Sequence, residues 1–405
     1  MRVALAFLLW VLPGLALAQA RLTGTVRDSV TQQPLAFASV FLANTTLGVT
    51  TTEQGTFTFP QVPAGTYDLV ASYVGYRLTQ QSIRVGSGAQ QLTLRLAPTA
   101  NQLGEVVVRP NPNRVSDFQK FTELFLGTTT FSRQCRIANP SDVLLDYDPT
   151  TNELTASAYK FVQVDNYALG YRVKYYGLRF VSNFTQQVVT FYGQPVFEEI
   201  PPRSDRQQRQ WEANRVRAYR GSLAHFLRSV RDSQLTAQGF VARRLRLVTN
   251  PRFARADSLR QALLRQHRAY SAAERDSLGR WVQVPPSFAL LYTRPLHLDS
   301  LRRIADGGQR VFLRFHDHLQ VTYLLAGPDA NYHSRPSRYA RGPAPALPQD
   351  RQVSQLVLLQ RESEIEPNGQ LANPLAVFTD EYWGFEKMGE FLPVNYLPPP
   401  ALPHP

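Results

Sequence analysis

The chain contains little cysteine and lysine and no hydrophobic run long enough to span a membrane. Cys135 is the sole cysteine among 405 residues, so no disulfide can form within the chain. After the first twenty residues, no stretch reaches the 18 consecutive apolar residues that indicate a transmembrane helix. The net charge of +13 comes almost entirely from arginine. The lysines are Lys120, Lys160, Lys174 and Lys387. A hydrophobic core must therefore hold the fold without cross-links, which a chain of this length can achieve.

The first eighteen residues have the pattern of a secretory signal peptide. Arg2 supplies a positive start, Val3 to Leu12 form a short apolar run, and a small-x-small cleavage site ends at Ala18. The apolar run is too short to span a bilayer. We therefore predict a signal peptide over residues 1–18 and an exported mature chain. Its expected location is the periplasm, the outer membrane surface or the medium.

The basic charge is spread along the chain, with no run of five or six like charges. A basic protein can bind nucleic acid, an anionic membrane surface or an acidic polysaccharide. The predicted export argues against nucleic acid. The charge pattern leaves two interpretations, which are a solvated arginine-rich surface and an anionic envelope surface as partner.

Residues 21–96 show the alternating pattern of a half-buried antiparallel sheet. Apolar side chains recur at every second position in several short runs, as at Phe57 and Phe59 or at Leu92, Leu94 and Leu96. Glycine and proline lie between the runs, where tight turns require them. Many short strands joined by regular turns are typical of a sandwich. We therefore predict a β-sandwich over residues 19–98.

The same residues resemble a known domain family. The matching motifs, in chain order, are Gly24-x-Val26, Pro34-Leu35, Ala38-x-Val40, Thr52-x-x-Gly55-x-Phe57-x-Phe59, Pro63-x-Gly65-x-Tyr67-x-Leu69 and Gly75-Tyr76. Together they resemble the carboxypeptidase-regulatory-like domain of Bacteroidetes cell-envelope proteins. The resemblance implies a transthyretin-like β-sandwich of about seven strands.

The resemblance does not extend to the peptidase after which the domain is named. Such enzymes hold zinc through a His-x-x-Glu pair and a distant histidine. No histidine in this sequence is followed three residues later by glutamate; His225, for example, is followed by Arg228. The sequence contains no cofactor motif either. It therefore favours a non-enzymatic role and predicts no catalytic residues and no cofactor.

A linker and a second domain follow the sandwich. Proline and asparagine at 110–113 indicate a linker over residues 99–115. Residues 116–396 mix strand patterns with a helical period at about 204–280, which predicts an α+β domain with a helical insertion. Composition predicts a mobile loop at about 328–350 and a proline-rich tail at 397–405. Predicted strands are 130–137, 143–147, 153–164, 170–181, 187–200, 288–293, 310–325 and 353–360. The predicted fold class is mainly β, with an α+β second domain.

Motifs in the second domain resemble a group of Bacteroidetes envelope proteins whose C-terminal region has no known role. They include Phe125-Leu126-Gly127-Thr128-Thr129, Tyr219-Arg220-Gly221-Ser222-x-x-His225-Phe226 and Tyr382-Trp383. In addition, the segment Leu103–Val108 resembles the one that follows this sandwich in outer-membrane receptors that take up glycans. That likeness implies an alternative role as an accessory component of a glycan uptake system.

His316 and His318 are candidate metal ligands. If residues 310–325 form one strand, both imidazoles point to the same face and could reach one metal ion. Arg314 and Gln320 share that face, which equally fits an ordinary exposed strand. Because the sequence names no third ligand, it predicts no metal site, and His316 and His318 are the candidates that the structure must place.

Three further patterns could carry chemistry. Ser222 and His225 lie within one turn of a predicted helix and could form a nucleophile–base pair. The pairs Glu198–Glu199 and Asp380–Glu381 are carboxylates of the kind that glycoside hydrolysis uses, but adjacent strand residues point to opposite faces. Strand aromatics could line a sugar-stacking groove, although such residues are commonly core. They are Tyr171, Tyr175, Tyr176, Phe180, Phe184, Phe191 and Tyr192.

The sequence as a whole favours an exported cell-envelope protein that binds or supports rather than reacts. Its expected partner is an envelope protein, a glycan or an anionic surface, with no nucleic acid and no transmembrane segment. Two alternatives stay open beside this interpretation. One is the accessory role in glycan uptake, and the other is a hydrolase in the C-terminal domain that acts on envelope or dietary polymers.

Overall fold

The computed structural model describes residues 19–86, 88–99, 113–266, 269–284, 286–333 and 350–399. The predicted signal peptide lies outside the described residues, as do most of the predicted linker, most of the predicted loop at 328–350 and the end of the tail. The chain divides into two compact units. The first comprises residues 1–43 and 47–102, and the second comprises residues 44–46 and 103–405.

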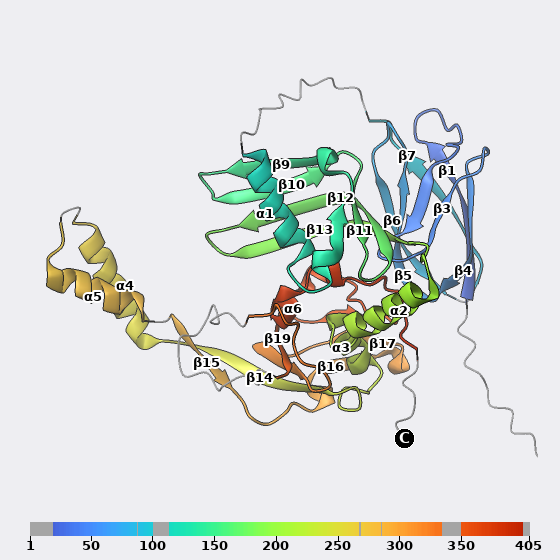
Figure 1. The fold of residues 1–405 in the computed structure, drawn as a ribbon. Helices are drawn as coiled ribbons and strands as arrows, with labels where there is room; N and C mark the ends of the chain where they lie inside the picture. The colour runs from blue at the N-terminus through green and yellow to red at the C-terminus, as the bar shows by residue number, and fades with distance from the viewer. Residues whose placement is uncertain are drawn as a thin grey trace, which may run out of the picture. The chain divides into compact units, whose positions relative to one another are not determined.

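The first unit is a β-sandwich of seven strands, as predicted from the sequence (Figure 1). One sheet has the order β4-β1-β7 and the other the order β3-β2-β5-β6. β1 pairs with β4 antiparallel and with β7 parallel. The strands are β1 (Gln19–Asp28), β2 (Ser39–Leu42), β3 (Gly48–Thr50), β4 (Thr56–Pro63), β5 (Gly65–Ser72), β6 (Thr79–Val85) and β7 (Gln90–Leu96).

The alternating side chains of these strands fill the space between the two sheets. Phe57 and Phe59 are buried, and their rings meet edge to face with centroids 5.9 Å apart. Leu69 and Leu94 enter the same core from β5 and β7. Each fully buried side chain of this size contributes about 1.5–3 kcal/mol. The core therefore stabilises the sandwich without a disulfide.

The second unit begins with a helix on a six-stranded sheet. The sheet order is β8-β11-β12-β10-β9, and β13 pairs with β12. Helix α1 (Arg114–Leu126) packs against it through Phe121 and Phe125, whose rings lie 5.0 Å and 6.5 Å from the ring of Phe180. The strands are β8 (Cys135–Ile137), β9 (Val143–Asp148), β10 (Glu153–Ala158), β11 (Phe161–Asn166), β12 (Tyr171–Asn183) and β13 (Val188–Glu199).

Two predicted strands in this region are corrected. Residues 153–164 form parts of two strands, β10 and β11, each paired with a different half of the long strand β12. Residues 130–137 form a strand only at β8, because the loop before it carries a short 3-10 turn at Ser132–Gln134. In both places a turn without glycine interrupts the apolar alternation, so the sequence pattern runs on where the strand does not.

Helix α2 (Asp205–Tyr219) is fixed to the turn between β11 and β12 by its side chains. Trp211 Nε1 donates to the carbonyl of Tyr167 at 2.7 Å, and Asn214 Nδ2 donates to the next carbonyl, that of Ala168, at 2.8 Å. Arg215 Nε donates to the following carbonyl at 2.8 Å. Gly170 ends this turn with a φ of +71° and lies directly against the Trp211 ring. The helix therefore satisfies backbone groups that the turn leaves unpaired.

The C-terminal half of the second unit holds two more sheets around helix α3 (Leu223–Arg231). The orders are β15-β14-β18-β19-β21 and β16-β17-β20. Phe226, Leu227 and Val230 of α3 are buried with Leu313 and Leu319 of the sheets. The strands are β14 (Phe240–Thr249), β15 (Ser287–Leu291), β16 (Arg302–Ala305), β17 (Arg310–Leu313), β18 (His318–Tyr323), β19 (Gln352–Leu358), β20 (Ser363–Ile365) and β21 (Val377–Glu381).

The predicted helical insertion at about 204–280 is only partly correct. Helices α2, α3, α4 (Pro251–Leu264) and α5 (Ala272–Val282) lie in it, and a capping box of Ser271 and Glu274 begins α5. However, strand β14 crosses the insertion between α3 and α4. Its arginines alternate irregularly with apolar residues, which hid the strand period. A short helix α6 (Tyr382–Phe385) follows β21.

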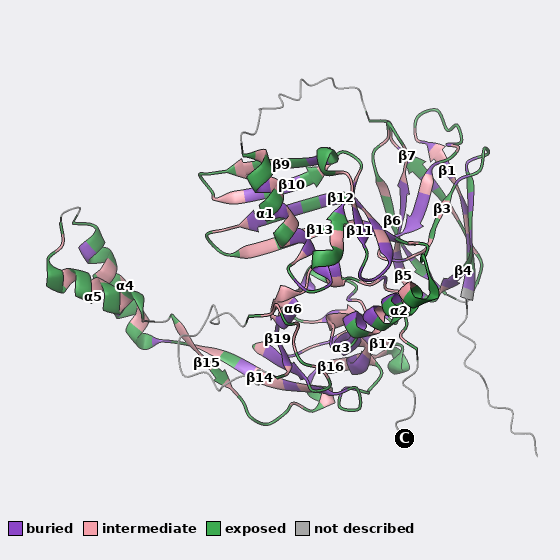
Figure 2. Cartoon of the chain, viewed as in Figure 1, coloured by how far each residue is buried: buried purple, intermediate pink, exposed green. Residues whose placement is uncertain are grey.

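Within the described residues, no helix is long and apolar enough to cross a membrane. The remaining helical elements are 3-10 turns at Ser132–Gln134, Pro140–Asp142, Leu298–Ser300, Asp306–Gly308, Pro374–Ala376 and Met388–Glu390. Figure 2 shows that buried residues gather along the sheets, whereas α4 and α5 are largely exposed or partly exposed.

Candidate functional site

One end of the sandwich is held together by a buried carboxylate. Asp28, at the end of β1, accepts hydrogen bonds from the backbone N–H groups of Val30 at 2.6 Å and Thr31 at 3.0 Å. Its other oxygen accepts a hydrogen bond of 2.7 Å from the hydroxyl of Tyr76. These bonds, that of Tyr76 foremost, hold the pKa of Asp28 below its usual range. Asp28 therefore fixes the loop after β1 beside the loop between β5 and β6.

These loops and their neighbours expose four large apolar side chains at one end of the sandwich. Val30 is 74% exposed, Phe37 67%, Val74 75% and Leu78 38%. The register of β2 and β5 places Phe37 near Val74, because Ser39 at the start of β2 faces Ser72 at the end of β5. The hydrogen bond between Asp28 and Tyr76 holds the loop of Val30 beside the loop that carries Val74 and Leu78. We call Val30, Phe37, Val74 and Leu78 the apolar loop end. Grouped exposed apolar residues mark interaction surfaces more often than single ones do.

Phe37 is the most unusual member of the apolar loop end. Its φ is +59°, in the left-handed region that a bulky residue rarely adopts. Its backbone N–H donates to the carbonyl of Thr51 at 3.2 Å, which holds this conformation. The hydroxyl of Thr51 donates to the Leu35 carbonyl and accepts from the N–H of Ala38, which secures the same turn. A strained backbone that presents an aromatic ring to solvent is a pointer to function.

The second unit carries a strained turn of its own, between β21 and α6. Glu381 has φ +59° and ψ −128°, a region that is almost confined to glycine. Its carboxylate accepts a hydrogen bond of 3.0 Å from the Tyr332 hydroxyl. Burial raises the pKa of Glu381, and the charge of Asp380 adds to the rise. The turn therefore presents a carboxyl group that holds its proton more tightly than a free glutamate.

Three more carboxyl groups influence one another next to this turn. Burial raises the pKa of Glu390 to about 7, and burial raises the pKa of Glu386 well above its usual range. The charges of Glu390 and Asp329 contribute to the shift at Glu386. Burial alone would raise the pKa of Asp329, but the backbone N–H groups of Asn331 and Thr130 donate to its carboxylate and hold the pKa low. We call Asp329, Glu386 and Glu390 the carboxylate cluster.

The carboxylate cluster joins three segments that are distant in the sequence. Thr129 Oγ1 donates to Glu390 Oε1 and lies 2.8 Å from Ser132 Oγ. The Tyr382 hydroxyl accepts the backbone N–H of Asp329 at 3.1 Å. The cluster can hold a proton on one carboxyl group beside an ionised one at neutral pH, which is the arrangement that acid–base chemistry uses.

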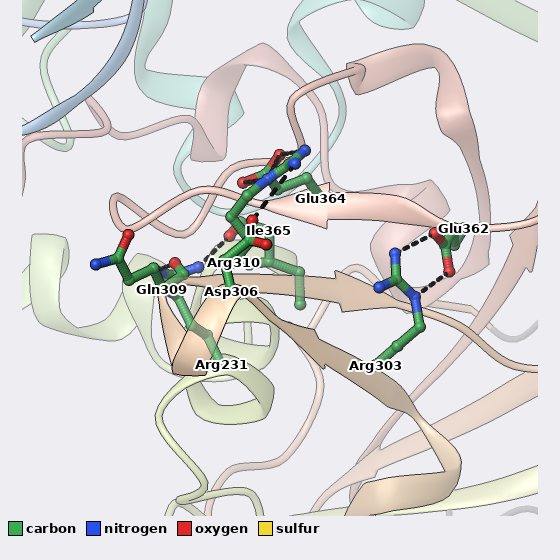
Figure 3. A network of polar contacts seen from close by, with 8 residues as sticks. All are labelled: Arg231, Arg303, Asp306, Gln309, Arg310, Glu362, Glu364 and Ile365. Atoms are coloured by element: carbon green, nitrogen blue, oxygen red, sulfur yellow. Dashed lines mark hydrogen bonds and ion pairs between the residues drawn. The ribbon is translucent and has the colours of Figure 1, made fainter.

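A set of ion pairs occupies the outer face of the sheet β16-β17-β20 (Figure 3). Arg303 contacts both oxygens of Glu362 at 3.0 and 2.5 Å, and Arg310 contacts Glu364 at 2.7 Å. Both guanidinium groups also lie over the Phe312 ring, 4.2 and 4.9 Å from its centroid. These charges neutralise one another, and partly exposed pairs add little stability. The arginines and glutamates of this face pair with one another, so the face is not a candidate binding or catalytic site.

The structure separates the two candidate metal ligands. The predicted strand 310–325 is two strands, β17 and β18, with a bend at residues 316–317 and a φ of +61° at Asp317. His316 lies in the bend and is exposed, while His318 begins β18 and is half-buried. The argument that one strand face carries both imidazoles is therefore wrong. Within the described part of the chain, no three His, Cys, Asp or Glu side chains are grouped so as to hold a metal ion.

Ser222 and His225 both have structural partners. Ser222 caps α3, because its Oγ accepts the backbone N–H of His225 at 3.2 Å. His225 is buried; its Nδ1 accepts the N–H of Gly221 at 3.1 Å, so the proton on Nε2 donates to Gln238 Oε1 at 3.0 Å. Burial lowers the pKa of His225. The imidazole Nδ1 is occupied by the backbone and does not activate Ser222.

The adjacent carboxylates of Glu198 and Glu199 also have different partners. Glu198 pairs with Lys174 at 2.5 Å, whereas Glu199 pairs with Arg215 at 3.2 Å. Burial raises the pKa of the Cys135 thiol to about 12, so it stays protonated at neutral pH.

The aromatic side chains of β12 and β13 belong mainly to the core. Phe125 of α1 packs edge to face on Tyr175 and Phe191, with ring centroids 5.5 and 5.2 Å away. Buried members of the predicted set are Tyr171, Tyr175, Tyr176 and Phe180, and partly buried ones are Phe184 and Phe191. Tyr192 is exposed. These contacts leave the rings packed against one another and α1.

Sequence reasoning missed the residues that stand out in the structure. The alternation of residues 37–42 predicts that Phe37 belongs to a strand, on the face opposite to Ala38 and Val40, yet it lies in the turn before β2. Glu386 and Glu390 carry the usual helix spacing of four, but their partner Asp329 lies 57 residues before Glu386. No spacing motif connects the three. The burial that shifts their pKa values arises only from packing.

Comparisons with known proteins identify the first unit. Residues 22–108 match the family of the CarboxypepD_reg-like domain. The chain thus carries a carboxypeptidase-regulatory-like domain of mainly β structure, as the sequence predicted. Among the curated proteins, none matches this chain.

Several solved structures are similar to parts of the chain. The pilus 2b backbone protein of group B streptococcus has 21% identity, covers 20% of this chain and 41% of its own, and has a TM-score of 0.18. 3-Chlorocatechol 1,2-dioxygenase of Rhodococcus opacus 1CP has 14% identity, covers 20% of this chain and 61% of its own, and has a TM-score of 0.17. A chain of a type II cohesin–X-dockerin complex of Acetivibrio cellulolyticus has 18% identity, covers 27% of this chain and 76% of its own, and has a TM-score of 0.19. Likenesses at these scores do not identify a function.

Proposed function

We propose that this protein is an exported cell-envelope protein that binds or supports a partner, with the sandwich as its recognition module. The match of residues 22–108 to a regulatory-like domain supports a non-catalytic role for this module. The observation that carries the proposal is the apolar loop end. It exposes Val30, Phe37, Val74 and Leu78 from loops that Asp28 and Thr51 hold in place.

The physical argument concerns Phe37. An exposed phenylalanine in a left-handed turn gains little from burial and costs backbone strain, so it does not contribute to folding. The same ring contributes about 1.5–3 kcal/mol when a partner buries it. A rigid loop keeps it in place without a further entropic cost, which favours binding. The partner is an envelope protein or a glycan, because both present apolar faces that such a ring covers.

Co-sedimentation with lipid-extracted envelope fragments from the source cells tests the proposal. The wild-type chain should sediment with the fragments, and a Phe37→Gly, Val74→Ser double variant should be retained at least about tenfold less, because each buried apolar contact contributes more than 1 kcal/mol. Leu375→Ser is the matched control, since Leu375 is 58% exposed in the second unit and lies outside the apolar loop end. Equal retention of all three proteins would overturn the proposal.

A second candidate function is hydrolysis of a glycosidic bond in the second unit. One observation favours it, namely that the pKa of Glu386 and Glu390 is raised while that of Asp329 is lowered within one cluster. Opposed pKa shifts of neighbouring carboxyl groups separate a proton donor from an ionised partner. Release of reducing ends from envelope or dietary polysaccharides by the wild type, abolished in Glu386→Gln and in Asp329→Asn, would support it. No release by folded wild-type protein would dismiss it.

A further inference from the structure

Two helices and a two-stranded ribbon extend from the five-stranded sheet β15-β14-β18-β19-β21 of the second unit. Residues 240–245 of β14 pair with β18, only Leu245 pairs with both β18 and β15, and residues 246–249 pair with β15 alone. Helices α4 and α5 follow at the tip of this ribbon, away from the other strands of the sheet (Figure 1). We call β15, the second half of β14, α4 and α5 the arm.

The arm cannot bury its own apolar side chains. In its helices only Ala256 and Leu263 are buried. Large apolar side chains remain exposed on the helices and the ribbon, namely Leu259, Leu264, Val282 and Leu290. Two helices or two strands are too few to form a closed core. The arm therefore offers apolar contacts to a partner outside this chain.

The arm is also basic. Residues 250–284 contain seven arginines and three carboxylates, a net charge of +4 (7 − 3). Arg252, Arg255 and Leu259 lie on one exposed face of α4, because their spacings of three and four residues are those of a helix face. On the other side of the helix, Asp257 pairs with Arg260 at 2.5 Å. Among the described residues, Arg252 and Arg255 form no ion pair, so both guanidinium groups face solvent.

We propose that the arm docks on the surface of an anionic lipid bilayer. Arginine forks match phosphate oxygens in two-point contacts, and the exposed leucines and Val282 enter the boundary between headgroups and acyl chains. Trp281, in the last turn of α5, is of the residue type that favours this boundary. A second copy of the chain is a poor partner, because the chain carries +13 and basic arms repel. The proposal is independent of the apolar loop end.

Flotation with lipid vesicles tests the proposal on the full chain. The wild type should float with vesicles that contain phosphatidylglycerol and not with vesicles of phosphatidylcholine alone. Arg252→Glu with Arg255→Glu should lower the bound fraction at least about tenfold, since each arginine near an anionic surface contributes about 1 kcal/mol. The control Arg136→Glu with Arg179→Glu changes two exposed arginines outside the arm by the same total charge and should lower binding less than about twofold.

Two further variants separate the contributions. Leu259→Ser leaves the net charge unchanged and should still weaken binding several-fold, because apolar insertion is lost. Phe37→Gly should bind vesicles like the wild type, so a failure of the apolar loop end and a failure of the arm are distinguishable. Equal loss in the arm and control pairs, no flotation with anionic vesicles, or arm-dependent binding to polyglutamate instead of vesicles would each overturn the proposal. Unchanged far-UV circular dichroism verifies that each variant is folded.

Discussion

Replacing Phe37 with glycine should leave the stability of the sandwich nearly unchanged. The left-handed backbone of a residue with a Cβ costs about 1–2 kcal/mol, which glycine recovers. Glycine loses about 0.5–1 kcal/mol through the entropy of the unfolded chain. Because Phe37 is already 67% exposed, about a third of the burial energy is lost, or roughly 0.5–1 kcal/mol. The sum lies within about 1 kcal/mol of zero.

Urea unfolding followed by circular dichroism measures this change. The comparison variant is Phe59→Ala, since Phe59 is 2% exposed in the same sandwich and its truncation should cost about 3–5 kcal/mol. Both variants remove an aromatic ring from the same sandwich, one ring exposed and the other buried. A loss above about 2 kcal/mol for Phe37→Gly would refute the reasoning, because Phe37 would then be a structural residue.

Glu390→Gln should make the free energy of unfolding less dependent on pH between 4.5 and 7. Because the folded pKa of Glu390 is raised, the wild-type free energy of unfolding falls by about 3 kcal/mol as pH rises through this window. Urea melts of both proteins at pH 5 and pH 8 should show the difference. His225→Gln should reduce the loss of stability as pH falls below 6.5, because burial lowers the folded pKa of His225 and the unfolded chain binds the proton first. In acid titrations, the free energy of unfolding should fall more steeply with pH in the wild type than in the variant. Gly170→Ala should destabilise the second unit by more than about 2 kcal/mol, since the methyl group overlaps the Trp211 ring at positive φ, and thermal melts check this. Arg228→Lys should expose residues 391–396 to faster hydrogen exchange, because the guanidinium donates to the carbonyls of residues 368, 394 and 396 at 2.8 to 3.1 Å and a lysine cannot reach all three.

The sandwich was predictable because its local signals agree. Alternation at Phe57, Phe59 and Leu94, together with glycine turns, indicates the same strands that long-range pairing then forms. Period two indicated a sandwich of several short strands with alternating buried faces, and the family resemblance implied that there are about seven of them. Even here the pattern misplaced Phe37, because a turn residue between Leu35 and Ala38 fits the alternation by chance.

The second unit was less predictable because its signals conflict. The run through His316 and His318 keeps a strand composition, but a left-handed residue at Asp317 breaks it into β17 and β18. Strand β14 carries Arg243, Arg244 and Arg246 among its apolar residues, and this composition resembles that of the flanking helices. Backbone breaks without glycine or proline leave no mark in a single sequence.

The candidate sites could not be predicted for a related reason. The carboxylate cluster exists because Thr129, Asp329 and Glu390 meet in the folded unit, and their shifted pKa values depend on burial. For the arm, the sequence predicted only helices that contain arginines. Its apolar exposure follows from the absence of a third layer over it within the described residues, which is a property of the tertiary structure.

The most direct test of the proposed binding role is the dissociation constant of the full chain for isolated, lipid-extracted envelope fragments, measured for the wild type and for Phe37→Gly. The two proteins should have nearly equal stability, so any difference reports on binding and not on folding. A dissociation constant raised at least about tenfold in Phe37→Gly is the predicted result, which corresponds to the loss of about 1.4 kcal/mol or more. Equal dissociation constants would contradict the assignment of the sandwich as the recognition module.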